Sequence, residues 1–348
     1  MDRKAHETQG TAALTMPLFG RKNAVADYVL ENSRQSRLRM LAAVVFATMS
    51  VSCGSIQASH HQTPEAATSR SLYSEETGTG ERTIVFLPGL LGTTSYWKAA
   101  RLDALGNDAR LIYLDELGFG RSPWPDVEYT LDDHLDAIRG TLVARGATRH
   151  VTIVAHSFGA ILAAYYAARY PDEVEALYLF GTPVYANEAE AKLHVGEMSG
   201  LAGLVVKSRS LARVVCAIHS AMGPLAARLA PYMRKDLPPE VARDGALHFW
   251  PSLEGSVYNV ILTKPIEVPL RGLTAKVTFV HGDLDDVTEV GRVHALAGEI
   301  DATVIDMPGT HASYWRTAAP ALERAGLWPQ GTATPKWPVS GSVTERRR

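Results

Sequence analysis

Short apolar runs alternate with amphipathic stretches along the middle of the chain. Each run has the length of a strand that is buried on both faces of a sheet. Six such runs predict strands at residues 83–87, 110–114, 150–155, 176–180, 276–280 and 302–307. Helical periodicity lies between them, at about residues 131–145, 158–169, 289–298 and 312–325. The alternation predicts an α/β fold, in which helices flank a mostly parallel sheet on both faces.

One interval breaks this alternation. Between Phe180 and Lys276 there is no clear strand, and the sequence instead contains helical stretches such as residues 211–230. We therefore expect an inserted helical cap over about residues 183–270. Working residues in a parallel sheet sit on loops at the C-terminal ends of the strands, so both ends of the insert are expected at that edge.

The N-terminal segment has a different pattern. A polar stretch containing several arginines ends at Arg39, and twelve mostly apolar residues, 40–51, follow it. As a helix these residues would span roughly 18 Å, whereas the core of a bilayer is about 30 Å thick. The run is too short to span a membrane and has the length of a signal-peptide core.

The sequence "SVSC" at residues 50–53 resembles a bacterial lipoprotein signal, in which a small residue precedes a cysteine that is lipidated after cleavage. This resemblance implies that Cys53 carries a lipid, and that the protein is exported and anchored in the bacterial envelope, at the outer membrane or in the periplasm. A plain secretion signal and an uncleaved or buried helix are the alternatives. We expect four segments: a targeting segment 1–53, a flexible linker 54–68, a folded domain 69–328 and a disordered tail 329–348.

Composition and charge narrow the classes of function. Hydrophobic residues make up 46% of the chain and charged residues 21%, which is ordinary for a soluble globular protein. The formal net charge of −2 leaves no basic excess, which argues against nucleic acid as the main partner. The two cysteines, Cys53 and Cys216, provide no disulfide framework. The sequence contains neither a P-loop nor an H-E-x-x-H pair, and we expect no cofactor, no metal and a small-molecule substrate.

The clearest candidate for chemistry is "VAHSFGA", residues 154–160. Ser157 directly follows a predicted strand and begins a predicted helix, with the small residues Ala155 and Gly159 two positions away on either side. A tight strand-to-helix turn would expose the serine hydroxyl, and bulky neighbours at those positions would collide. A serine that only caps the helix is the alternative, but a cap needs no small residues on both sides. The pattern favours a nucleophile.

A serine nucleophile needs a general base, and the base needs an acid that orients it. "HGDLDD" follows the fifth predicted strand and contains Asp283, Asp285 and Asp286 as candidate acids. "PGTHA" follows the sixth and contains His311 as the candidate base. The chain order Ser, Asp, His is the order of an α/β-hydrolase triad.

Four motifs in this order resemble the α/β-hydrolase superfamily: "LPGLLGTTSYW" at 87–97, "DELGFGRS" at 115–122, "AHSFG" at 155–159, and the "GDLD" and "GTH" stretches. The resemblance implies a G-x-x-D spacing that selects Asp285, and an oxyanion hole formed by the backbone N–H groups of Leu90 and Phe158. The chain departs from the usual pattern at Ala155, where Gly is common, and at Pro88, where His is common.

The nucleophile narrows the reaction. Dehalogenases and epoxide hydrolases of this superfamily have Asp where this chain has Ser157, which argues against both. A Ser-Asp-His set fits acyl transfer, and we expect a carboxylic ester hydrolase that acts on small to medium apolar acyl groups. Another acyl-transfer or C–C bond hydrolase with the same triad, and a non-catalytic binding protein, are the alternatives.

Several side chains are candidates for the substrate pocket. Tyr96 and Trp97 follow the oxyanion loop, and further apolar residues come from the cap: Tyr185, Met198, Leu204, Phe249 and Trp250. The alternative for each is packing of the cap and the sheet. His156 and His281 adjoin the site and are expected to pack or tune it.

Overall fold

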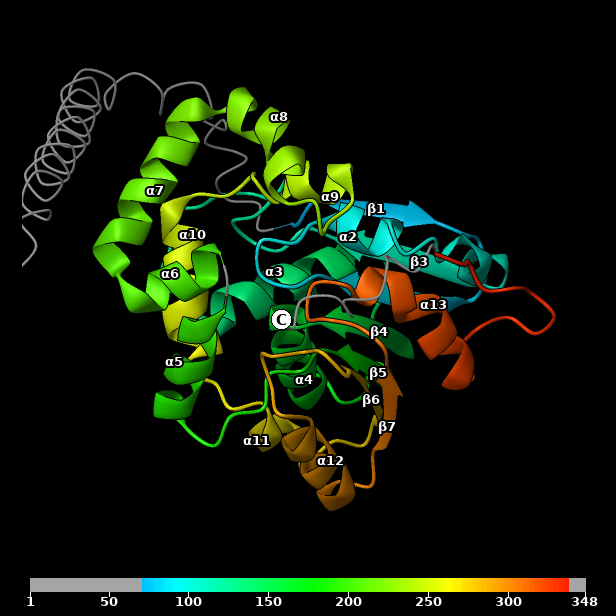
Figure 1. Ribbon diagram of the computed structural model, residues 1–348. Helices are drawn as coiled ribbons and strands as arrows, with labels where there is room; N and C mark the ends of the chain where they lie inside the picture. The colour runs from blue at the N-terminus through cyan, green and yellow to red at the C-terminus, as the bar shows by residue number, and fades with distance from the viewer. Residues whose placement is uncertain (1–70, 199, 338–348) are drawn as a thin grey trace, which may run out of the picture. The chain divides into compact units, whose positions relative to one another are not determined.

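The computed structural model describes residues 71–198 and 200–337, and Cys53 and the predicted targeting segment lie outside these residues. The described residues form a seven-stranded sheet in the order β1-β3-β2-β4-β5-β6-β7 (Figure 1). The strands are β1 Ser74–Thr77, β2 Arg82–Leu87, β3 Ala109–Leu114, β4 Val151–His156, β5 Val174–Phe180, β6 Lys276–Gly282 and β7 Thr303–Met307. Strands β2 to β7 are parallel, which confirms the predicted fold class.

Strand β1 is the one strand of this sheet that the apolar pattern did not predict. It pairs antiparallel with β3, with Ser74 opposite Leu114. Its sequence, SEET, is polar and carries no alternation, because an edge strand needs little apolar surface. Ion pairs hold it instead: Glu76 binds Arg110, and Glu75 binds both Lys98 and Arg121.

Helices cover both faces of the sheet, as Figure 1 shows. They are α2 Thr94–Lys98, the 3-10 helix η2 Asp103–Asn107, α3 Leu131–Ala144, α4 Phe158–Arg169, α12 Val290–Glu299 and α13 Tyr314–Arg324. Successive strand residues point to opposite faces, so Val85 joins the core beneath α3, α4 and α12 while Phe86 joins the core beneath α2 and α13. Two apolar cores therefore sandwich the sheet.

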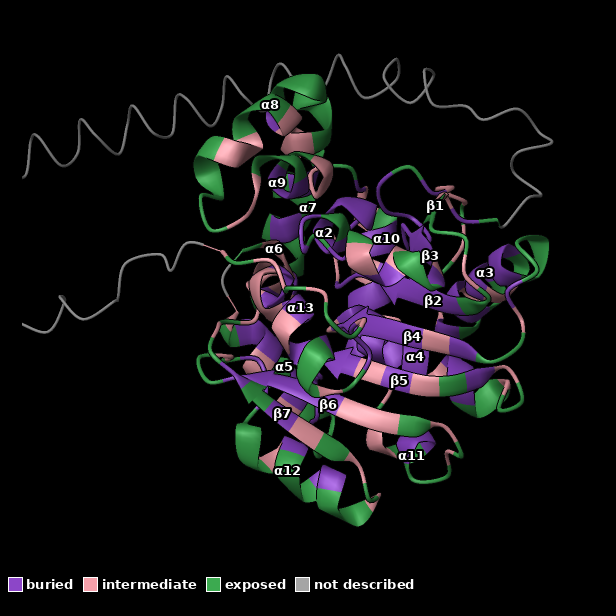
Figure 2. Ribbon diagram, turned by 90° about the vertical axis from the view of Figure 1, so that its right-hand side faces the viewer, coloured by how far each residue is buried: buried purple, intermediate pink, exposed green. Residues whose placement is uncertain are grey.

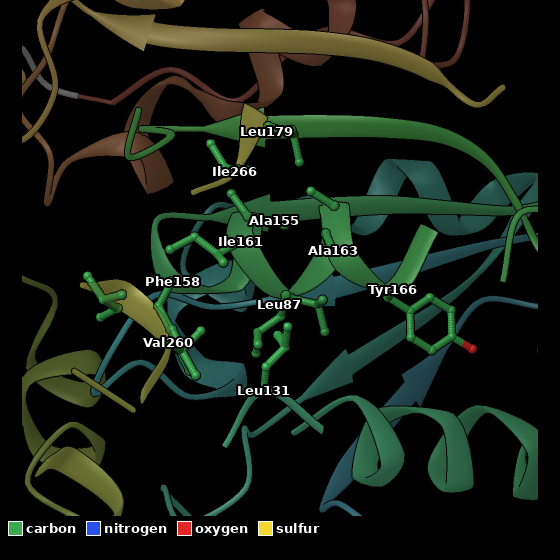
Figure 3. Close-up of a cluster of buried hydrophobic side chains, with 14 of the residues drawn as sticks. Leu87, Leu131, Ala155, Phe158, Ile161, Ala163, Tyr166, Leu179, Val260 and Ile266 are labelled. Carbon is green, nitrogen blue, oxygen red and sulfur yellow. The ribbon is translucent and has the colours of Figure 1, made fainter. Parts of the chain in front are cut away.

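Helix α4 lies at the centre of the larger core. Nine of its twelve residues are buried, because it is covered by the sheet on one side and by other helices on the rest of its surface. Figure 3 shows the cluster around it, with labelled side chains Leu87, Leu131, Ala155, Phe158, Ile161, Ala163, Tyr166, Leu179, Val260 and Ile266. This packing fixes the position of the first turn of α4, where Ser157 lies.

The segment between β5 and β6, which the sequence predicts to be a cap, is helical. Its helices are α5 Glu188–Glu197, α6 Leu201–Lys207, α7 Arg209–Met222, α8 Pro224–Met233, α9 Pro239–Asp244, α10 Trp250–Gly255, the π-helix η3 Ser256–Ile261 and α11 Glu267–Leu270. The last two pack against the core helices, η3 against α3 and α4 and α11 against α4. The end of the insert is therefore part of the main core.

The start of the predicted tail makes specific contacts. Trp337 packs edge-to-face on Trp315, with ring centroids 4.9 Å apart, and the guanidinium of Arg101 lies 4.3 Å from the centre of its ring. Trp328 donates from Nε1 to the Thr332 carbonyl at 2.9 Å. Residues 329–337 thus lie against α13 and the turn that follows α2.

The burial of α4 generates a matched pair of stability predictions. Leu162 in α4 has no exposed surface, whereas Leu193 in α5 is 60% exposed. We expect Leu162→Ala to lower the free energy of unfolding by about 2–5 kcal/mol, since the change leaves a cavity. Leu193→Ala is expected to change it by less than about 0.5 kcal/mol. Urea denaturation followed by circular dichroism measures both, and equal effects would contradict the placement of α4.

Candidate active site

Ser157 lies at the junction of β4 and α4 in a strained backbone conformation. Its φ of 51° and ψ of −115° fall in a region that L-residues seldom adopt. A Cβ at position 159 would collide with the Pro88 carbonyl oxygen, and one at position 89 would lie 2.7 Å from His156 Nδ1 and 3.2 Å from the Ser157 Cβ. The turn therefore requires glycine at both positions. The Ser157 hydroxyl makes no capping bond to α4, which disfavours the simple helix-cap interpretation.

The three predicted triad residues come together at the C-terminal edge of the sheet. Ser157 Oγ lies 2.8 Å from His311 Nε2. His311 Nδ1 lies 3.1 Å from Oδ1 and 3.0 Å from Oδ2 of Asp285. With Nδ1 as the donor to the carboxylate, Nε2 is free to accept the proton of the serine. The order is that of nucleophile, base and orienting acid.

Asp285 is held in its ionised form. Burial by itself would raise the pKa of this carboxyl, but the charge and hydrogen bond of His311 outweigh burial and hold the pKa well below its usual range. The Val287 N–H donates to Oδ1 at 3.0 Å and reinforces the effect. A permanently charged acid can stabilise His311 when that residue becomes protonated.

The two competing aspartates lie elsewhere. Asp283 is exposed and accepts a hydrogen bond from the Gly309 N–H at 2.8 Å, so it ties together the loops that carry the acid and the base. Asp286 is exposed. Of the three candidates, Asp285 is the one that contacts His311.

Tyr314 is a site residue that the sequence did not indicate. Its hydroxyl donates to Asp285 Oδ2 at 2.6 Å and accepts from the Gly282 N–H at 2.8 Å. The residue lies in the first turn of α13, three positions after His311, and nothing in "HASYW" distinguishes it from a packing tyrosine. Tyr314 thus joins the acid loop to the helix that follows the base.

His156 and His281 pack beside the triad. His156 donates from Nε2 to the His311 carbonyl at 2.9 Å and stacks on Tyr96, with ring centroids 4.9 Å apart. Burial, and the neighbouring His311, lower the pKa of His156 to about 3, so it stays neutral and positions the backbone of the base. Burial also lowers the pKa of His281.

One predicted oxyanion donor, Phe158, directly follows Ser157, and the other, Leu90, belongs to the loop that packs against the serine turn. Phe158 is the first residue of α4, and the N–H groups of a first turn have no acceptor within the helix. Leu90 follows Gly89, the residue that approaches the Ser157 Cβ. The loop is closed by a hydrogen bond from the Gly92 N–H to the Gly89 carbonyl at 2.8 Å. A substrate oxyanion between these N–H groups would be stabilised electrostatically.

The candidate pocket residues differ in their surroundings. Trp97 has no exposed surface and donates from Nε1 to the Leu87 carbonyl at 2.9 Å, so it covers the sheet. Phe249 stacks on Trp124 with the ring planes 3° apart, and Trp250 begins α10 and is partly buried against the larger core.

The candidate pocket residues from the cap also differ in how far they are buried. Tyr185 is buried and stacks on His194. Met198 and Leu204 are partly buried against the larger core. Over the described residues, no cluster of three His, Cys, Asp or Glu side chains is arranged to hold a metal ion.

Glu116 is a second feature that the sequence did not indicate. It follows β3 in the "DELGFGRS" turn, and 1% of its surface is exposed. Among the described residues neither carboxylate oxygen has a hydrogen-bond partner. The adjacent Asp115 accepts from the N–H groups of Thr94 at 2.6 Å and Arg121 at 2.9 Å. Burial, together with the charge of Asp115, raises the pKa of Glu116 to about 8.

This shift predicts a pH-dependent stability. Between an ordinary pKa near 4.5 and the folded value of about 8, the unfolded chain releases a proton that the folded chain retains. The free energy of unfolding should therefore fall as pH rises, by up to about 1.4 kcal/mol per pH unit. We expect Glu116→Gln to remove this loss, so that the variant is more stable than the parent at about pH 8 and similar at about pH 5. Urea denaturation at both pH values tests this, with the exposed Glu81→Gln as the control; a variant advantage that does not grow with pH would refute it.

Comparisons with known proteins agree with this architecture. Residues 82–212 match a family model described as the alpha/beta hydrolase fold. A segment of 107 residues is 35% identical to the "Probable lysophospholipase BODYGUARD 2" of Arabidopsis thaliana, and the match covers 29% of this chain and 23% of that protein. The chain spans about a quarter of the length of the curated plant relatives that it matches in this region.

Solved structures are similar over most of the chain. A thermophilic esterase from Thermogutta terrifontis has a TM-score of 0.57 and 22% identity, covering 74% of this chain and 92% of its own. The enol-lactonase from Burkholderia xenovorans LB400 has a TM-score of 0.57 and 21% identity, covering 74% of this chain and 95% of its own. At these identities the likeness concerns the fold. With its parallel sheet and a serine turn between β4 and α4, the chain has the fold of the α/β-hydrolase superfamily.

Proposed function

We propose that the protein is a serine hydrolase that acts by acyl transfer, with carboxylic esters as its substrates. The observation that carries this proposal is the continuous set of contacts from Ser157 through His311 to Asp285. A hydroxyl, an imidazole and a buried carboxylate in this order form an activated nucleophile. A structural serine would need neither partner.

The proposed reaction follows from the geometry. His311 Nε2 takes the proton as Ser157 Oγ attacks the ester carbonyl, and the Leu90 and Phe158 N–H groups donate hydrogen bonds to the developing oxyanion. His311 then returns the proton to the leaving alcohol, which departs and leaves an acyl-enzyme. A water molecule gives one proton to His311 as its oxygen attacks the acyl carbonyl. The second tetrahedral intermediate then collapses, His311 returns that proton to Ser157 Oγ, and the carboxylic acid is released.

Two alternatives to an ester hydrolase keep the same fold. Another acyl-transfer or C–C bond hydrolase would use the same triad, and a binding protein would use none of it. The contacts of His311 support catalysis over binding. The relatives named lysophospholipase, esterase and enol-lactonase support ester chemistry. A panel of esters, amides and thioesters distinguishes the reactions.

The cap supports a preference among substrates. Its apolar residues Met198 and Leu204 are partly buried, and the insert leaves the sheet at the edge where Ser157 lies. A helical cover at this edge would exclude water from an apolar pocket. Small to medium apolar acyl groups are therefore the proposed substrates.

Replacement of the nucleophile provides the first test. We expect Ser157→Ala to lower the catalytic rate constant by about 10⁴-fold or more, because the remaining site retains only binding and oxyanion stabilisation. Labelling by a fluorophosphonate should disappear as well. Ser220→Ala, at an exposed position of α7, is the control and should keep both. Near-normal turnover by Ser157→Ala would refute the proposed mechanism.

The acid is tested by a set of three substitutions. Asp285→Asn should lower the rate constant by several orders of magnitude, roughly 10⁴-fold, since an amide leaves His311 in the wrong tautomer. Asp283→Asn and Asp286→Asn should have much smaller effects, because neither contacts the imidazole. Steady-state kinetics on one ester compares all three. If Asp286→Asn were the most damaging change, the acid would be assigned to the wrong residue.

The role of the cap is tested by a series of esters of increasing acyl length. We expect a maximum at short to medium chains, and a shift of that maximum in Met198→Ala and Leu204→Ala if these two side chains line the proposed acyl pocket, because each change would enlarge it. Leu193→Ala, in the same cap but exposed, is the matched control. Fluorophosphonate labelling of Ser157 should persist throughout. Equal rates across the series in every variant would show that the cap does not select the acyl group.

A further inference from the structure

The outer side of the cap carries most of the exposed apolar surface. We call residues 209–233, which form α7 and α8, the cap hairpin. Eight of the fourteen exposed large apolar side chains in the described part of the chain belong to it: Leu211, Val214, Val215, Met222, Leu225, Leu229, Tyr232 and Met233. Figure 2 shows α8 mostly in the colours of exposed and intermediate residues. A concentration of this kind on a soluble domain usually marks an interaction surface.

The apolar positions form a stripe along one side of α7. Leu211, Val215 and Met222 are separated by four and seven residues, which places them on one face of a helix. A different face contains Ala212 and Cys216, and both of these are buried. Helix α7 therefore uses one face for the cap, while the side chains on a second apolar face remain 37–52% exposed.

The inner face of α7 is well anchored. Cys216 Sγ lies 3.8 Å from His248 Nε2, and His219 Nε2 lies 3.2 Å from the Ala246 carbonyl oxygen. Arg209 also forms an ion pair with Glu254 in α10. These contacts fix the orientation of α7, so the outward direction of the apolar stripe is a property of the folded cap.

Basic residues outnumber acidic ones around the hairpin, although Arg209 pairs with Glu254 and Arg234 pairs with Asp236. Residues 198–235 contain six lysines and arginines and no aspartate or glutamate: Lys207, Arg209, Arg213, Arg228, Arg234 and Lys235. Arg213 and Arg228 are exposed on the hairpin and form no ion pair with any described residue. This local excess contrasts with the net charge of −2 for the whole chain. The surface is both apolar and cationic.

We propose that the cap hairpin docks on a membrane surface that contains anionic lipids. Amphipathic helices that lie in the interface combine an apolar face with lysine or arginine on the polar face, as this hairpin does. Anionic headgroups complement the basic side chains, whereas a second copy would bring the same positive charge to the contact. An anionic lipid surface matches both the apolar side chains and the positive charge of the hairpin.

The hairpin lies on the membrane and does not cross it. Within residues 71–198 and 200–337, no single helix has the length and hydropathy to span a bilayer. Helices α7 and α8 meet that criterion only together, and they are bent by 114° at the break between them. A bent pair with exposed arginines suits the headgroup boundary, where side chains reach water. This docking does not depend on the proposed catalysis and is measured without substrate.

The test is cosedimentation of the full chain with lipid vesicles. All variants carry Cys53→Ser, so that no attached lipid contributes. One variant removes apolar surface, Leu211→Ser with Tyr232→Ser and Met233→Ser, and another removes charge, Arg213→Gln with Arg228→Gln. Vesicles of phosphatidylcholine alone are compared with vesicles that also contain phosphatidylglycerol. We expect the parent to prefer the anionic vesicles, and the apolar variant to bind them about tenfold less tightly.

The charge variant should lose the preference for phosphatidylglycerol and its sensitivity to salt. The matched controls change exposed residues outside the cap: Val143→Ser with Val290→Ser, and Arg149→Gln with Lys276→Gln. These should bind as the parent does, and thermal unfolding verifies that every variant is folded. Parent-like binding by the apolar variant would overturn the proposal, since another segment, such as residues 40–51, would then hold the membrane. The proposal would also be overturned if the parent formed a dimer without lipid and the apolar variant did not. The surface would then bind a second copy of the chain.

Discussion

The site depends on the close approach of the β2 loop to the turn at Ser157. This turn holds a non-glycine residue at positive φ, a conformation that costs of order 1–3 kcal/mol. The cost is offset by the burial of α4, whose first turn cannot relax without exposing Phe158 and its neighbours. The same approach brings Gly89, the neighbour of Leu90, close to Ser157. Strain, core packing and the position of the oxyanion loop are thus aspects of one arrangement.

Sheet order then determines which loops meet. Strand β5 lies between β4, which ends at the serine, and β6, which ends before the acid. The residue after β5 is Gly181, and a Cβ there would lie 3.0 Å from Asp285 Oδ2 and 3.1 Å from His311 Nδ1. The same Cβ would lie 2.6 Å from Tyr314 Cε2, so a side chain at this position would crowd Tyr314 as well as the acid and the base. Because Gly181 has no side chain, Asp285 and His311 can approach each other near Ser157, although they lie 128 and 154 positions after it in the chain.

The sequence was informative where a single physical requirement decides the outcome. Apolar runs predicted β2 to β7 because a strand buried on both faces must be apolar throughout. Residue types at strand ends indicated Ser157 and His311, because few residue types can serve as a nucleophile or as its general base. Strand β1 was missed, since an edge held by ion pairs carries no apolar pattern. Tyr314 and the burial of Glu116 depend on neighbours from distant elements, which no local pattern reports.

The hydroxyl of Tyr314 has a consequence for motion. It bridges Asp285 and the Gly282 N–H, and it belongs to the helix that starts just after His311. A second tie runs from Asp283 to the Gly309 N–H. With two such cross-braces, the loops that carry the acid and the base behave as one rigid block. Any movement of these loops would therefore carry Asp285 and His311 together and keep their contact.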